Sequence, residues 1–176
     1  MERKRKDYEI EEEFRTFEEY ETALHALMDV VGMSVHITES MVGRSSRAFY
    51  YRLNKDYGAK IGKMAGKKKN VEEAIESLRR CQDWWDIQLW SKSGESLIDE
   101  SEDDIKFKIV IRDCIIRQTL LRENLPQRSM MCYLTNGFIM GALETMLDMK
   151  GDIEVIHAGN NACLKEITLT DIAGGK

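Results

Sequence analysis

Apolar residues recur at intervals of three and four along the first third of the chain, which is the spacing of an amphipathic helix. A first helix is predicted from Phe14, and Gly32 is placed to end it. The same spacing returns over residues 40–65, where three glycines interrupt it, and predicts a second helix. The apolar positions that carry the first pattern are Phe17, Tyr20, Leu24, Leu27, Met28 and Val31.

The lysine-rich tract 66–70 breaks the helical pattern, and Asn70 is a suitable N-cap for a third helix over residues 71–80. From residue 85 apolar and polar side chains alternate, so the period changes to that of strands. The remaining elements are then expected in the order strand 85–90, loop 91–104, strand 105–111, helix 115–124, helix 129–148, strand 153–157, turn 159–161 and strand 163–169.

This order of elements predicts an α+β fold in which N-terminal helices pack on a mainly antiparallel sheet. The sequence contains no internal repeat and no sign of a second core. Residues 1–13 are charged and lack periodicity, so we expect a flexible N-terminus. Residues 14–172 are then expected to form one domain, for which 176 residues in total supply enough apolar surface.

The charge of the chain narrows the range of partners. Its net charge of −5 argues against a dominant nucleic-acid or anionic-membrane surface.

No apolar run approaches the roughly 20 residues that span a bilayer. The basic residues at the N-terminus are followed by acidic ones instead of the apolar core of a signal peptide, so a cytoplasmic location is expected. In that compartment the four cysteines are expected to be free thiols or metal ligands.

The last third of the chain concentrates groups that can bind a metal. Cys132 opens the predicted helix 129–148, and the hairpin that follows carries Glu154, His157 and Cys163. Zinc prefers four such nitrogen, sulfur and oxygen ligands in a tetrahedron. On a regular strand Glu154 and His157 face opposite sides, so a bulge or a strand end is needed to bring them together. The alternative is that both cysteines are buried as small apolar residues.

The pattern of a helix with a cysteine and Gly-x-x-x-Gly, a strand with a glutamate, a turn, and a cysteine before a final strand resembles the 4-vinyl reductase domain family. The resemblance covers residues 131–169. It implies a ligand-binding fold related to haem-NO-binding domains and to subunits of the transport-protein-particle complex. It also implies a structural zinc held by Cys132, Glu154, His157 and Cys163, with His157 standing where relatives have cysteine.

The resemblance implies binding of a small apolar, hydrocarbon-like molecule without catalysis. No nicotinamide, flavin or phosphate-binding motif is present, so the reductase name is not carried over. Aromatic residues are candidates for lining an apolar pocket, although on spacing alone the core or an interface is favoured for them. The candidates are Phe49, Tyr50, Trp84, Trp85, Trp90 and Phe138.

Three questions stay open at this point. Gly137 and Gly141 either present a face to a ligand or allow close packing on another element, and packing is favoured because glycine in a helix costs stability. The chain either senses or carries a ligand, acting as a homodimer or through a protein partner, or it is a scaffold subunit with a filled interior. The third question is whether the chain is instead an enzyme, either a hydrolase that uses Cys114 or a reductase-associated subunit.

Overall fold

The computed structural model describes residues 16–81, 85–102, 104–126 and 129–171. In these residues five helices and an antiparallel five-stranded sheet form an α+β fold, as predicted. The predicted flexible residues 1–13 lie outside the described residues. The elements are α1 Phe17–Val42, α2 Ser45–Ala65, α3 Val71–Arg80, β1 Asp86–Trp90, β2 Ile98–Glu100, β3 Asp104–Arg112, α4 Ile115–Arg122, α5 Met130–Leu147, β4 Met149–Ala158 and β5 Cys163–Asp171.

The sheet has the strand order β1-β3-β5-β4, and β2 pairs with the same edge of β3 as β1 does. Its central pair is β3 and β5, with Phe107 opposite Ile167 and Ile111 opposite Cys163. The sequence interpretation placed β2 inside a loop, which was wrong. A half-buried isoleucine followed by two exposed acidic residues is too short to show apolar alternation, so only pairing with β3 identifies β2 as a strand.

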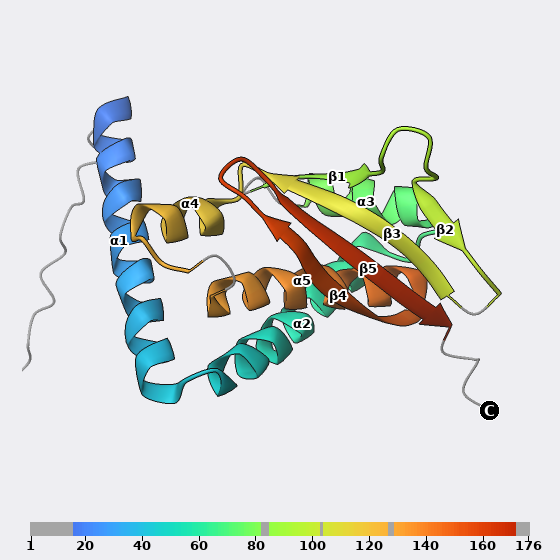
Figure 1. Cartoon of the computed structure of the whole chain (residues 1–176), viewed down its shortest axis with the longest axis horizontal. Coiled ribbons are helices and arrows are strands. Elements are labelled where there is room, and N and C mark those ends of the chain that lie inside the picture. Colours follow the sequence, from blue (N-terminus) through green and yellow to red (C-terminus); the bar gives the residue numbers. More distant parts are fainter. Residues whose placement is uncertain (1–15, 82–84, 103, 127–128, 172–176) are drawn as a thin grey trace, which may run out of the picture.

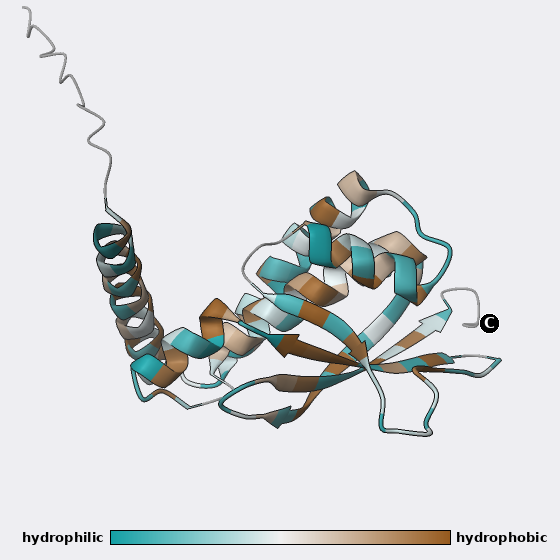
Figure 2. Ribbon diagram, turned by 90° about the horizontal axis from the view of Figure 1, so that it is seen from above, coloured by the Kyte–Doolittle hydropathy of each residue, from teal (hydrophilic) through white to brown (hydrophobic). Residues whose placement is uncertain are grey.

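The helices cover one face of the sheet and leave the other face open (Figures 1 and 2). Strand β5 shows how the two faces are assigned. Its odd-numbered residues from Cys163 to Leu169 are buried under the helices, and the even-numbered ones between them are partly exposed. Helix α5 lies between the sheet and α2 and is buried on most of its circumference, as expected for a helix that is apolar all round.

Glycines set the close approach of α2 and α5. A Cβ atom on Gly137 would collide with the carbonyl oxygen of Tyr51, and one on Gly141 would collide with that of Lys55. Gly58 on α2 lies equally close to the backbone of Phe138 on α5. The predicted packing role of Gly137 and Gly141 is therefore confirmed, and the partner is a helix of the same domain.

Helix α1 runs through Gly32 and ends only at Val42, so the predicted end at Gly32 was wrong. Gly32 lies inside the helix, where its missing side chain leaves room for Glu123 at the end of α4. Gly43, with a φ of 67°, is the glycine that ends α1. At the other end the Thr16 hydroxyl accepts from the Glu19 amide in a capping box. None of the described helices is long and apolar enough to cross a membrane.

Candidate functional site

Two of the four predicted metal ligands lie near each other inside the domain. Cys163 begins β5 and is buried under the helices, and Cys132 lies in the first turn of α5. The Cys163 thiol acts electrostatically on Cys132, and Cys114, the residue that precedes α4, acts on both of them. Three of the four cysteines therefore gather where the starts of α4, α5 and β5 meet.

The other two predicted ligands lie on the open face of the sheet. Strand β4 contains a bulge between Val155 and His157, as convergence of Glu154 and His157 required. The bulge places Glu154 opposite Glu166 and His157 opposite Leu164, so both side chains are exposed on the face away from Cys163.

The residues present do not fit a four-ligand zinc site as the structure arranges them. In the described ranges no group of three or more histidine, cysteine, aspartate or glutamate side chains is positioned to hold a metal. Zinc therefore stays a prediction of the resemblance.

A buried lysine stands among the three thiols instead. Lys165 lies on the inner face of β5, opposite Ile109 and Val155, and is 3% exposed. Its Nζ donates a hydrogen bond of 2.5 Å to Oδ1 of Asn136 on α5. Burial lowers the pKa of Lys165, and the neighbouring thiols of the described residues oppose this shift.

Arg117 adds a second buried cation at the same place. It lies in the first turn of α4, is 5% exposed, and acts on Cys163 both by its charge and by a hydrogen bond. Its Nε and Nη1 atoms have no hydrogen-bond partner in the described part of the chain. We call Arg117, Lys165, Asn136 and the three thiols of Cys114, Cys132 and Cys163 the interior polar cluster.

The thiols of this cluster do not supply a negative charge to pair with its basic side chains. Burial raises the pKa of Cys132 to about 11, although the positive charge of Lys165 acts in the opposite direction. Burial also raises the pKa of Cys163, against the charges of Lys165 and Arg117. Both are therefore neutral thiols near neutral pH. Cys114, the candidate nucleophile of the hydrolase alternative, is buried beside them.

Sequence reasoning missed both cations. Lys165 left a usable signal, because it occupies the apolar phase of strand β5 together with Ile167 and Leu169. Arg117 left none that we recognise, since a basic residue in a short helix usually faces water.

The predicted pocket aromatics are divided among several surroundings. Trp85 and Phe138 are buried with ring centroids 5.6 Å apart, and they form part of the core. Phe49 is largely exposed on α2, and Tyr50 is half-buried beside it. Trp84 lies outside the described residues. Among the candidates that the structure describes, Trp85 thus contacts Phe138 in the core, and Phe49 contacts Tyr50 on α2.

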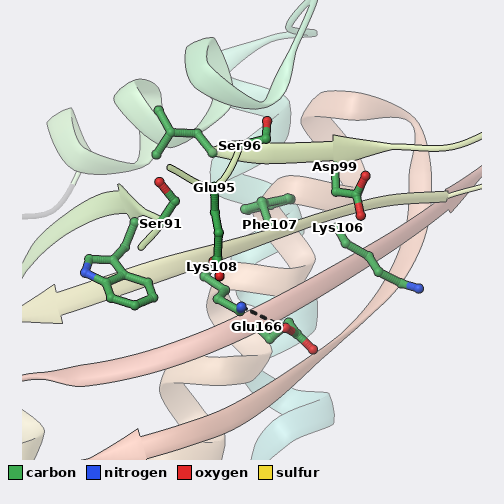
Figure 3. Close-up of a pocket in the computed structure, with 10 residues that line it drawn as sticks. Ser91, Glu95, Ser96, Asp99, Lys106, Phe107, Lys108 and Glu166 are labelled. Atoms are coloured by element: carbon green, nitrogen blue, oxygen red, sulfur yellow. Dashed lines mark ion pairs between the residues drawn. The ribbon is translucent and has the colours of Figure 1, made fainter. Parts of the chain in front are cut away.

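Trp90 lines a cleft of about 410 Å³ on the open side of the sheet. Figure 3 shows charged side chains around this cleft, including Lys108 in an ion pair of 3.7 Å with Glu166. Glu95, Asp99 and Lys106 complete its charged lining. Sites for small apolar molecules are lined mainly by apolar side chains, so this cleft suits such a ligand less well than the interior.

Comparisons with known proteins show the fold alone. The sequence matches no known protein family and no curated protein. Among solved structures, the chain is similar to the crystal structure of the phenol-responsive sensory domain of the transcription activator PoxR with phenol. The TM-score is 0.62 at 10% sequence identity, over 81% of this chain and 74% of that one. The chain thus shares its fold with that domain.

Proposed function

We propose that this domain binds a small, largely apolar molecule without transforming it, and that the interior polar cluster receives the polar group of that molecule. One observation carries the proposal. Arg117 in the first turn of α4, Ser129 at the N-cap of α5 and Thr135 in the second turn of α5 have buried polar atoms without a hydrogen-bond partner in the described residues. Since buried polar atoms in folded proteins nearly always have partners, a bound molecule is a natural source of the missing ones.

The surroundings of the cluster support an apolar body for the ligand. The strand neighbours of Lys165 and Cys163 on the inner face of the sheet are Ile109, Ile111 and Val155. The phenol of the similar sensory domain combines an apolar ring with one polar group, which is the combination that such surroundings would accept.

A sensing role follows from the position of α4. Its first turn carries Arg117, and its end contacts α1 through the ion pair of Arg122 with Asp29 and through Glu123 against Gly32. Displacement of this short helix would open the cluster to a ligand. The same displacement would be transmitted to α1.

The test is a search for the ligand followed by a stability assay. Molecules extracted from the purified protein are identified by mass spectrometry, and the melting temperature is measured with phenol, toluene and benzoate. We expect at least one ring compound to raise the melting temperature, because a ligand that binds only the folded state stabilises it. Thr135→Val should alter this rise, whereas Thr22→Val on the exposed face of α1 should not. No extracted molecule and no effect of any compound would favour the scaffold alternative.

We also propose that the domain forms a homodimer through α1. Phe17 is 82% exposed, Leu27 is 59% exposed, and Tyr20 and Leu24 lie exposed between them on the same helical stripe. In Figure 2, α1 stands at one end of the molecule, away from the sheet. A long helix with exposed apolar residues on the side facing solvent favours burial against a second copy.

The oligomeric state tests this second proposal. Light scattering after gel filtration should give twice the chain mass, and a variant with both Leu24→Glu and Leu27→Glu should be monomeric. Thr22→Glu introduces the same charge at a polar position of α1 and should leave the dimer intact. A wild-type monomer at micromolar concentration contradicts the proposal. Membership of the 4-vinyl reductase family and a cytoplasmic location stay predictions.

A further inference from the structure

The interior polar cluster contains two buried basic side chains and no carboxylate of the described residues. Neither Arg117 nor Lys165 forms an ion pair with a carboxylate of the described residues, although ten other ion pairs are present there. A guanidinium stays protonated in proteins, so Arg117 carries its charge inside the core. An uncompensated buried charge is strongly destabilising, which makes a missing anion the central feature of this site.

No side chain placed nearby fills that role. Glu39 of α1 is the carboxylate that acts on Cys132, but its Oε1 already accepts from the Met130 amide at 2.7 Å and pairs with Arg47 at 3.3 Å. The groups that act on the Lys165 amine are the three thiols, and no carboxylate is among them. Among the described residues Arg117 and Lys165 thus have no anionic partner, and their donor groups are available to a bound anion.

Resting on the proposed function, we propose that the ligand is a small organic acid whose carboxylate is held by Arg117 and Lys165. Arg117 offers two unpartnered donor atoms, Nε and Nη1, and hydrogen bonds from charged donors to a carboxylate are the strong ones. Arg117 and Lys165 both act on the thiol of Cys163, so the two side chains lie in the same part of the domain.

The apolar surroundings favour an acid with an apolar body over inorganic phosphate. Ile109 and Val155 flank Lys165 on the two neighbouring strands, and Ile111 flanks Cys163. These side chains offer no donors to a strongly hydrated dianion, but they match a ring or a branched chain. The start of α4 adds a favourable dipole, because Cys114 at its N-cap makes no side-chain hydrogen bond.

Binding of benzoate, phenol and toluene to the full chain tests this assignment. The three probes share one ring and differ in carrying a carboxylate, a hydroxyl or a methyl group. Isothermal titration should give benzoate an affinity at least about tenfold above that of toluene and of phenol, in line with the strength of hydrogen bonds to charged groups. Acetate and phosphate serve as anions that lack the ring.

Two arginine variants show whether the preference comes from the cluster. Arg117→Met removes the buried charge and should abolish the preference for benzoate. It should also raise the melting temperature of the ligand-free protein, because the buried charge is removed. Arg52→Met changes an exposed arginine of α2 and should keep the preference. If Arg117→Met does not fold, the order of the benzoate, phenol and toluene affinities in the wild-type protein still tests the preference for a carboxylate.

Each other outcome overturns the assignment in a distinct way. If toluene or phenol binds as well as benzoate, and Arg117→Met leaves this unchanged, the proposed function stands and the acid is wrong. Equal binding of acetate or phosphate overturns the apolar body. If none of the probes binds, the assignment and the proposed function fail together.

Discussion

Replacing Gly141 by alanine tests the reason for the close contact of α2 and α5. The added Cβ would lie 2.9 Å from the amide nitrogen of Ala59, whereas ordinary contact begins at 3.4 Å, and it would overlap the carbonyl oxygen of Lys55. These neighbouring atoms belong to the backbone of α2, so the overlap is relieved only if the two helices move apart. Overpacking of this kind costs about 1–3 kcal/mol, and we expect the upper end of that range.

The helix propensity of alanine offsets part of this cost, by about 1 kcal/mol relative to glycine. The net loss is then about 2 kcal/mol in the free energy of unfolding. For a chain of this size it corresponds to a fall of about 4–8 °C in melting temperature. Urea denaturation followed by circular dichroism measures the first quantity, and calorimetry measures the second.

Gly32→Ala is the matched control for this prediction. It makes the same change inside a helix, but the nearest obstacle is the side chain of Glu123, which can rotate away. Its stability should be unchanged or higher by up to about 1 kcal/mol. If Gly141→Ala is as stable as Gly32→Ala, the contact between the helices does not depend on the glycine and the reasoning fails.

Three further predictions concern the cysteines and the contact of α1 with α4. In the folded protein iodoacetamide at about pH 8 should modify exposed Cys81 but not Cys132 or Cys163, because burial and a raised pKa suppress their thiolates; mass spectrometry of peptides checks this, and equal labelling contradicts it. Because Glu154 and His157 lie on the face away from Cys163, elemental analysis should find no stoichiometric zinc in the purified protein; about one equivalent of metal per chain, lost in Cys132→Ala and in Cys163→Ala, would contradict this and support the zinc that the resemblance implies. A hydrogen bond from Arg122 holds the pKa of Asp29 below its ordinary value of 3.8, so the stabilisation is complete above that pH and declines as acid protonates Asp29. The stability difference between wild type and Arg122→Ala should therefore shrink below pH 3.8, and a constant difference in acid refutes it.

The bulge in β4 shows how far the site was predictable. Spacing alone indicated that Glu154 and His157 need an irregularity to share a face, and the structure contains one between Val155 and His157. Spacing did not indicate which face they would share. That depends on pairing with β5, which puts Cys163 on the inner side and both other residues on the outer side.

Local patterns were sufficient for the elements and the fold class. Period, caps and glycine placement are properties of neighbouring residues, and they predicted four of the five strands, the cap at Asn70 and the α+β arrangement. The sequence also favoured close packing for Gly137 and Gly141, whereas only the structure identified α2 as the partner. It determined these features because they depend on residues within a few positions of one another.

Only the tertiary structure decided where the chemistry lies. Arg117, Lys165 and Asn136 come from α4, β5 and α5, and they meet because the sheet and both helices enclose them together. The phase of β5 indicates that Lys165 is buried, but the burial of Arg117 and the absence of a counter-ion in the described residues cannot be seen in the order of residues. Both depend on contacts between segments far apart in the chain, and these contacts made a buried pair of cations the candidate site.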